Sequence, residues 1–178
     1  MNPSPALVVC MGVSGCGKTT VARTIATETG IHFLEADDFH SPQNKAHMAA
    51  GKALDATMRA PWIESICRAL REKSAQGEHC VLACSALRRS HRQLFRETGF
   101  RTLFLFLDGS REMISEWMRQ RDDHFMPVGL LDSQFKTLES PLGEKDVNRI
   151  DLETGWETVT DTAVEAACKI INTSGQIR

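Results

Sequence analysis

Residues Met11–Thr20 read MGVSGCGKTT, with glycines at 12, 15 and 17 and Lys18 directly after the last of them. The apolar run Ala6–Met11 precedes this stretch, and Lys18–Thr29 follow it with apolar residues at helical spacing. The segment fits the pattern GxxxxGK(S/T), in which a glycine-rich loop joins a strand to a helix. We therefore expect a β-strand, a phosphate-binding loop and an α-helix in this order.

The residue types of this loop suit the binding of a nucleotide triphosphate. Glycines let consecutive backbone N–H groups turn toward phosphate oxygens, and the positive end of the following helix dipole points at the same anion. Lys18 can reach the β- and γ-phosphates, and the Thr19 hydroxyl is the candidate Mg²⁺ ligand. The residues expected to bind ATP are Gly12, Val13, Ser14, Gly15, Cys16, Gly17, Lys18, Thr19 and Thr20. A glycine-rich turn without function is the alternative, and the strand before and helix after the loop favour nucleotide binding.

Along the rest of the chain, short apolar runs alternate with amphipathic stretches. Strands are expected at Ala6–Met11, Ile31–Glu35, Val81–Cys84, Thr102–Leu107 and Val147–Leu152, and helices at Lys18–Thr29, Pro61–Ala75, Arg88–Glu97, Arg111–Arg121 and Thr158–Ile171. Pro61 suits the first turn of a helix, Gly30 a helix end and Gly77 a stop before the next strand. The alternation predicts an α/β three-layer sandwich with a mainly parallel five-stranded sheet, in a single domain over residues 1–178.

Composition excludes several classes of function. A net charge of −2 in 178 residues offers no polycationic surface for nucleic acid. The apolar runs are far shorter than the roughly 20 residues that cross a bilayer, and the N-terminus does not have the pattern of a signal peptide. No two of the six cysteines are spaced as CxxC, so free thiols in a reducing cytoplasm fit better than disulfides or a zinc site.

Polar residues follow the second expected strand in GIHFLEADDFHSPQNKAHM, where Asp37, Asp38, His40 and Asn44 occur together. Ligands in α/β sheets bind at the carboxyl ends of strands, beside the loop after the first strand. A carboxylate there could accept the proton of a substrate hydroxyl or hold Mg²⁺ through water. The alternative is a solvated acidic turn that caps the next helix. The Asp-x-x-His-x-x-x-Asn spacing favours a functional site.

Two further segments carry arginines. In CVLACSALRR, Cys80–Arg89, a strand is followed by Arg88 and Arg89, either of which could bind a carboxylate or phosphate, although a solvated helix start explains Arg89. In MRQRDDHFMPVGLLDSQFKTLESP, Arg119 and Arg121 precede a polar and then an apolar stretch. This pattern is typical of a mobile flap that brings positive charge over a triphosphate and excludes water. An ordinary helix–loop–helix is the alternative.

Taken in order and spacing, these segments resemble the gluconokinase family. The resemblance rests on MGVSGCGKTT, EADDFHSPQNKAHMAAGKAL, RAPW, VLACSALRR, RDDHFMP and LLDSQFKTLESP, and it covers about Val8 to Pro141. It implies a fold like that of nucleoside monophosphate kinases with a helical lid, here at about residues 121–139, and often a homodimer. The implied activity is transfer of the γ-phosphate of ATP to D-gluconate, with Mg²⁺, giving 6-phospho-D-gluconate and ADP.

The resemblance also implies roles for single residues. Asp37 would act as base or orienting group at the terminal hydroxyl, and Lys18 and Arg121 would stabilise the transferred phosphoryl group. The residues expected to bind the sugar acid are Asp37, His40, Arg59, Arg88 and His124. Gln134 and Glu139 match the family pattern without an assigned role.

Two departures from the family pattern concern the expected site. An acid usually precedes the arginine of the RxPW element, and here Thr57 and Met58 stand before Arg59. An arginine usually lies four residues before Arg121, and here that residue is Trp117. These differences leave two alternatives open: a kinase of a related sugar acid, and a nucleotide-binding protein without catalytic activity.

Overall fold

The computed structural model describes residues 4–120 and 128–173 and contains one five-stranded sheet. The strands are β1 (Ala6–Met11), β2 (His32–Glu35), β3 (Cys80–Ala83), β4 (Arg101–Asp108) and β5 (Val147–Asp151). They are ordered β2-β3-β1-β4-β5, and every neighbouring pair is parallel. The α/β class and the parallel five-stranded sheet are therefore confirmed, with each strand within a residue of its expected bounds.

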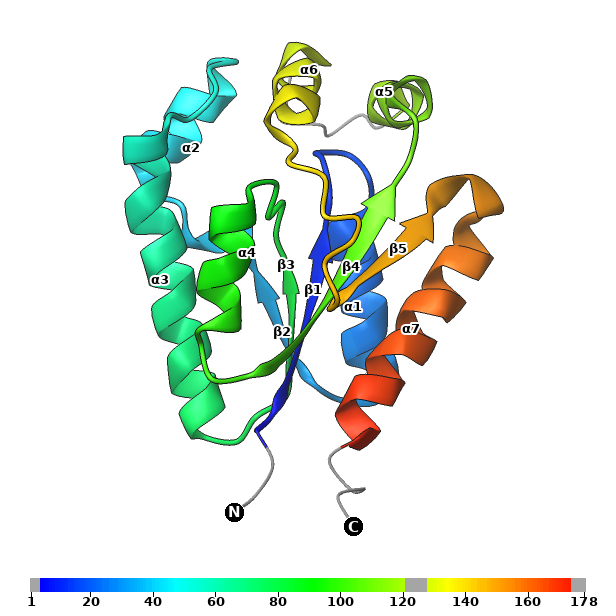
Figure 1. Cartoon of the computed structure of the whole chain (residues 1–178). Helices are drawn as coiled ribbons and strands as arrows, with labels where there is room; N and C mark the ends of the chain where they lie inside the picture. Colours follow the sequence, from blue (N-terminus) through cyan, green and yellow to red (C-terminus); the bar gives the residue numbers. More distant parts are fainter. Residues whose placement is uncertain (1–3, 121–127, 174–178) are drawn as a thin grey trace.

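Helices cover both faces of the sheet (Figure 1). They are α1 (Lys18–Thr29), α2 (Pro42–Ala49), α3 (Ala56–Ala75), α4 (Arg89–Arg96), α5 (Arg111–Arg119), α6 (Val128–Thr137) and α7 (Trp156–Asn172). Short 3₁₀ turns lie at Ala36–Phe39 (η1) and Leu152–Thr154 (η2). Helices α3 and α4 pack on one face, α1 and α7 pack on the other, and α2, α5 and α6 lie at the carboxyl ends of the strands.

The alternation of β1 produces two hydrophobic cores. Val8 and Cys10 face α1 and α7, whereas Leu7, Val9 and Met11 face α3 and α4. All residues of β1 are fully buried, as expected for the central strand of a parallel sheet covered on both sides. The cysteines in the described residues are free, and those in the strands are buried. No helix in the described part of the chain is both long and apolar enough to cross a membrane.

Helix α3 corrects one expectation. It begins at Ala56, with the Asp55 carboxylate accepting a hydrogen bond from the Met58 N–H at 2.8 Å, so Pro61 lies inside the helix and not in its first turn. The helix loses one backbone hydrogen bond at Pro61 because proline has no N–H. Burial of Trp62, Ile63, Ile66 and Leu70 against the sheet keeps the helix continuous. Gly30 ends α1 in the left-handed conformation, as expected.

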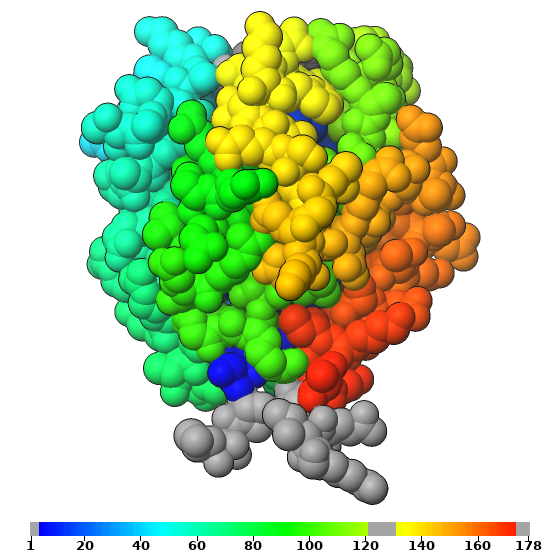
Figure 2. All heavy atoms as spheres, viewed as in Figure 1, coloured from blue at the N-terminus to red at the C-terminus, as the bar shows by residue number. Residues whose placement is uncertain are grey.

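Helix α2 lies where the sequence analysis expected no helix, and α6 lies within the segment expected to form a helical lid. Helix α2 follows the Ser41 N-cap, whose hydroxyl accepts from the Asn44 N–H at 3.1 Å. Figure 2 shows α6 and the segment after it lying across the molecule next to α4. These elements surround the carboxyl ends of the strands and form the rim of a cavity.

Candidate active site

A cavity of about 240 Å³ opens at the carboxyl ends of the strands. The predicted residues that line it are Ser14, Gly15, Gly17, Lys18, Thr19, Thr20, Asp37, His40, Arg59 and Arg88. Gly12, Val13 and Cys16 belong to the same loop but do not line it, and the Val13 and Cys16 side chains are buried in the core. Arg121 and His124 lie outside the described residues. The structure thus brings together four segments that are far apart in the sequence.

The phosphate-binding loop adopts a conformation that requires glycine. Gly17 has φ +95° and is the N-cap of α1, and a Cβ added there would lie 2.5 Å from the ring of Trp156. A Cβ on Gly12, whose φ is +144°, would lie 2.9 Å from the Leu107 carbonyl oxygen. No side chain caps the N-terminus of α1, so its first N–H groups and the positive end of its dipole remain available to an anion.

Lys18 and Thr19 each contact a neighbouring oxygen. The Lys18 ammonium donates to the Val13 carbonyl at 2.8 Å, and the Thr19 hydroxyl donates to Oε2 of Glu35 at 2.8 Å. Burial raises the pKa of Glu35, the hydrogen bond from Thr19 opposes this effect, and the nearby Asp37 carboxylate raises the pKa further. Glu35 ends β2 and lines the cavity. The sequence analysis missed this residue, although its place at the end of a strand beside the loop was a usable signal.

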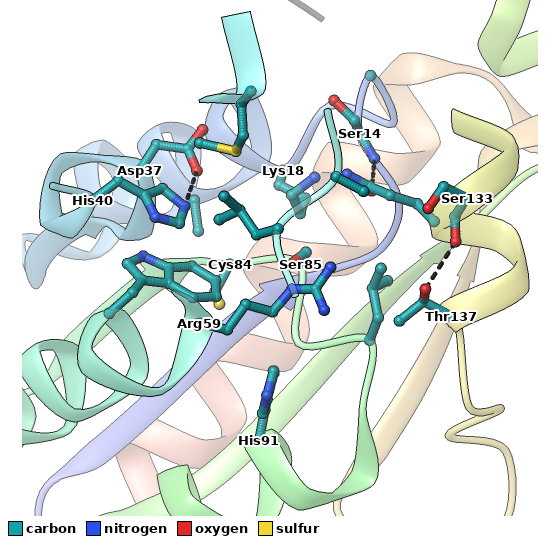
Figure 3. A pocket seen from close by; sticks show the side chains of 18 of the residues that line it. Ser14, Lys18, Asp37, His40, Arg59, Cys84, Ser85, His91, Ser133 and Thr137 are labelled. Atoms are coloured by element: carbon teal, nitrogen blue, oxygen red, sulfur yellow. Dashed lines mark hydrogen bonds and ion pairs between the residues drawn. The ribbon is translucent and has the colours of Figure 1, made fainter. Parts of the chain in front are cut away.

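The turn η1 presents Asp37 at the cavity and is held there by Trp62. The Trp62 indole N–H donates to the Ala36 carbonyl at 2.7 Å, and its ring stacks on His40 with centroids 4.3 Å apart. The His40 Nε2 lies 3.9 Å from Oδ1 of Asp37, which is otherwise well exposed. Burial lowers the pKa of His40, which favours the neutral form of this side chain. Figure 3 shows Asp37 and His40 on the opposite side of the cavity from Ser133 and Thr137 of α6.

Asn44 belongs to the packing of α2 and not to the cavity lining. Its side-chain amide donates to the Met58 carbonyl at 3.0 Å, which joins α2 to α3. The Asp-x-x-His-x-x-x-Asn spacing therefore combines two site residues with one structural residue.

Positive charge gathers at the end of the cavity formed by α3 and α4. Arg59 comes from α3, Arg88 is the N-cap of α4, and His91 lies one turn further along α4. Burial and the charge of Arg88 lower the pKa of Arg59. Burial, followed by the charges of Arg59 and Arg88, lowers the pKa of His91 to about 4. The two guanidinium groups of Arg59 and Arg88 lie close enough to favour an anionic ligand. The sequence analysis had not identified His91.

Helix α6 contacts both the phosphate-binding loop and α4. Oε1 of Gln134 accepts a hydrogen bond from the Ser14 N–H at 2.7 Å. Oε2 of Glu139, just after the helix, accepts from the Arg89 N–H at 2.6 Å. Arg89 itself is exposed at the start of α4, in agreement with the solvated helix start considered for it. The two residues that matched the family pattern without a role thus make contacts at the base of the expected lid.

Comparisons with known proteins point to one family. The AAA domain family matches residues 7–141. A gluconokinase from Gluconobacter oxydans is 40% identical over 164 residues, which cover 92% of both chains. A gluconokinase from Arabidopsis thaliana is 35% identical and covers 93% of this chain and 94% of its own. The chain belongs to the gluconokinase family.

Solved structures agree with this membership of the gluconokinase family. A sugar kinase from Janibacter sp. HTCC2649 superposes with a TM-score of 0.86 at 39% identity, over 98% of this chain and 100% of that one. A gluconokinase from Sinorhizobium meliloti 1021 superposes with a TM-score of 0.82 at 36% identity, over 96% of each chain. These likenesses confirm the kinase fold expected from the sequence.

The two departures from the gluconokinase pattern have visible structural consequences. Asp55, the remaining acid before Arg59, caps α3, and Ala56–Met58 form the first turn of this helix without a carboxylate. Trp117 packs edge to face on Trp156, with ring centroids 6.2 Å apart. Arg119, two residues after Trp117, is exposed and pairs with Glu116 at 2.6 Å.

Proposed function

We propose that this protein is a gluconokinase, which transfers the γ-phosphoryl group of ATP to the terminal hydroxyl of D-gluconate. One observation carries the proposal: a single cavity is lined by the phosphate-binding loop, the Asp37 carboxylate and the Arg59–Arg88 pair. A triphosphate, a hydroxyl and a carboxylate each find a complementary group there. The family names of the relatives, gluconokinases at 35–40% identity, support the same substrates.

The reaction follows from this arrangement as an in-line displacement. The acceptor oxygen forms a bond to the γ-phosphorus while the bond from this phosphorus to the β–γ bridging oxygen breaks, releasing ADP. The hydroxyl proton passes to the Asp37 carboxylate, whose Oδ1 lies 3.9 Å from the His40 ring. The amides of the phosphate-binding loop and of the start of α1 hold the phosphates with the Lys18 ammonium, apart from those of Gly12, Ser14 and Cys16, which donate to Ser85, Gln134 and Val13. Arg121 supplies further positive charge.

The acceptor is oriented by its charge. Arg59 and Arg88 bind the carboxylate of the sugar acid, since guanidinium groups offer paired donors to carboxylate oxygens. His40 and His124 contact its hydroxyl groups. This assignment places the carboxylate at the α3–α4 end of the cavity and the terminal hydroxyl near Asp37 and Lys18.

The residues beside Thr19 fit a magnesium ion. Within the described residues no group of three or more His, Cys, Asp or Glu side chains forms a metal cage. Mg²⁺ in kinases needs only one or two protein oxygens, because phosphates and water complete its shell. The Thr19 hydroxyl would bind Mg²⁺ directly, with the Glu35 and Asp37 carboxylates nearby. Bound there, Mg²⁺ would offset negative charge on the β- and γ-phosphates.

We further propose one kinase domain over residues 1–178, with a lid at about 121–139, that acts as a homodimer in the cytoplasm. The near-neutral net charge gives no support to a nucleic-acid or membrane partner. Gln134 at the middle of α6 and Glu139 after it connect this lid to the phosphate-binding loop and to α4.

The test is ADP release by the purified protein with D-gluconate, with and without Mg²⁺. Lys18→Ala should lower turnover by orders of magnitude, and Asp37→Asn should remove most activity while ATP affinity stays within about twofold. Wild-type turnover in Asp37→Asn would exclude the base assignment.

The first turn of α3, which has no carboxylate in Ala56–Met58, favours one second candidate, a kinase of a related sugar acid. The same assay with a series of aldonates decides between gluconate and a related sugar acid as the substrate. A higher kcat/KM for another aldonate would identify that compound as the preferred acceptor. Tight ATP binding without turnover on any of them would indicate a catalytically silent protein.

A further inference from the structure

Arg92 is a fully buried cation that lies behind the cavity and not in it. It lies on α4, one residue beyond His91, and its five N–H groups all face acceptors. Nη1 donates to the carbonyls of Ala86 at 2.9 Å and Leu87 at 3.1 Å, and Nη2 donates to the carbonyl of Glu139 at 3.1 Å and to Glu144. Nε donates to the two carboxylate oxygens of Glu144 at 3.1 and 3.2 Å.

The charge of Arg92 is balanced by Glu144. Burial would raise the pKa of Glu144, but hydrogen bonds from Arg92 and Arg96 outweigh this effect and hold it at about 2. Arg96 also pairs with Asp146 at 2.7 Å, and Arg89 lies 3.7 Å from Glu144, so the group is a network of three arginines and two carboxylates. A buried ion pair seldom stabilises a fold more than apolar side chains of similar volume would. The main effect of this network is therefore to fix the positions of the segments that it joins.

The network holds the turn that presents Arg88. Residues 84–88 connect β3 to α4, so the turn at residues 85–89 covers most of this connection and the first residue of the helix. Ala86, within this turn, is the only non-glycine residue with positive φ, +45°, in residues 4–120 and 128–173. Such a conformation is strained and persists only where surrounding contacts hold it. The carbonyls of Ala86 and Leu87 are the ones that Arg92 binds, and the Leu87 carbonyl also accepts from the Glu139 N–H at 2.9 Å.

The same contacts reach the base of the expected lid. Glu139 lies two residues after the end of α6, and its carbonyl, its N–H and its side chain all bond to α4 or to the turn before it. Figure 2 shows the segment after α6 lying against α4. Arg92 therefore sits where the turn of Arg88 meets the end of α6.

We propose that Arg92 is a positioning residue which, together with Glu139, fixes the turn at residues 85–89 so that Arg88 faces the acceptor carboxylate. This inference rests on the proposed function for the identity of the acceptor. It assigns Arg92 no contact with substrate. Its loss should weaken binding of the sugar acid and leave binding of ATP intact, because the phosphate-binding loop does not bond to Arg92.

The decisive comparison is Arg92→Lys with Arg96→Lys. Both variants keep the charge and disturb the same carboxylate network, but only Arg92 bonds the carbonyls of the turn. Arg92→Lys should raise the KM for D-gluconate at least tenfold, with the KM for ATP within twofold, whereas Arg96→Lys should leave both within twofold. Equal changes in the two variants, or a parallel rise in both KM values for Arg92→Lys, would reduce Arg92 to a structural residue and overturn the proposal.

A double variant tests whether Arg92 acts through Arg88. In an Arg88→Ala background, Arg92→Lys should raise the KM for D-gluconate by less than twofold further, since the group that it positions is already gone. A full tenfold increase in this background would contradict the inference. If Arg92→Lys does not fold, Glu139→Ala replaces it, because Glu139 is exposed and its side chain bonds only the start of α4 among the described contacts. The backbone contacts of residue 139 with Leu87 and Arg92 remain in this variant, so it should show a smaller rise in the KM for D-gluconate with the KM for ATP unchanged, and an unchanged KM for D-gluconate would refute the proposal.

Hydrogen exchange provides a readout that does not depend on the substrate. Amide exchange in residues 85–89 should be at least tenfold faster in Arg92→Lys and unchanged in Arg96→Lys. If the wild type does not phosphorylate gluconate, the proposed function fails, and the exchange comparison still decides whether Arg92 holds the turn. Equal exchange in the two variants would refute the positioning role.

Discussion

His91 should make the stability of this protein depend on pH in a measurable way. Its pKa in the folded chain is about 4, compared with 6.5 in an unfolded chain, owing first to burial and then to Arg59 and Arg88. As the pH falls, the unfolded chain takes up the proton first, so folding stability declines from about pH 6.5 down to pH 4. At about 1.4 kcal/mol per pH unit, the loss from this one residue reaches at most about 3 kcal/mol.

The measurement is urea unfolding of the wild type and of His91→Gln between pH 7.5 and 4.5. Burial also lowers the pKa values of His40 and His79, and these two contribute the same slope to both proteins. The difference between wild type and variant therefore isolates His91 and should change by about 2 kcal/mol or more over this range. A difference that stays constant with pH would show that His91 is not held neutral by its surroundings.

Three further predictions concern the nucleotide end of the cavity. Gly17→Ala should lower the free energy of unfolding by about 1–3 kcal/mol in urea, because of the positive φ and the approach of Trp156; unchanged stability would mean that the loop adjusts freely. Gln134→Glu should weaken ATP binding about tenfold in calorimetry, since it adds a negative charge beside the Ser14 N–H, and equal affinity would show that the phosphates bind elsewhere. Glu35→Gln should raise the Mg²⁺ concentration for half-maximal activity about tenfold or more, and an unchanged requirement would exclude Glu35 from the metal environment.

The parts of the fold that the sequence predicts well are those with local determinants. Strand β1 and helix α1 have the bounds expected from an apolar run, three glycines and Gly30. Each of these signals acts within a few residues: burial on both faces, backbone conformations open to glycine, and a left-handed helix end. Distant contacts were not needed to locate them.

Helix α3 shows where local rules mislead. Proline favours a first turn, so Pro61 suggested a helix start five residues too late. The actual start is set by the Asp55 cap, and the apolar residues after Pro61 pack on the sheet strongly enough to keep the helix through it. Tertiary burial outweighs the loss of one backbone hydrogen bond, and a preference measured for isolated helices does not include that burial.

The roles that the sequence did not reveal, those of Gln134 and Arg92, depend on contacts between distant segments. Gln134 meets Ser14 across 120 residues, and Arg92 meets Glu144 across 52. A glutamine or an arginine within a helix is common and gives no signal in the sequence. Only the folded structure shows that Gln134 contacts the phosphate-binding loop and that Arg92 contacts the turn at residues 85–89. The motifs indicate the groups that we propose to contact substrate, whereas the residues that hold these groups in place depend on the topology. Strands β3 and β1 are neighbours, so the turns after them lie side by side and are held by the segment that packs over this edge of the sheet. In this chain α6 and the segment after it pack over these turns. Gln134 and Glu139, which bond to the phosphate-binding loop and to α4, therefore lie close together near the end of the expected lid.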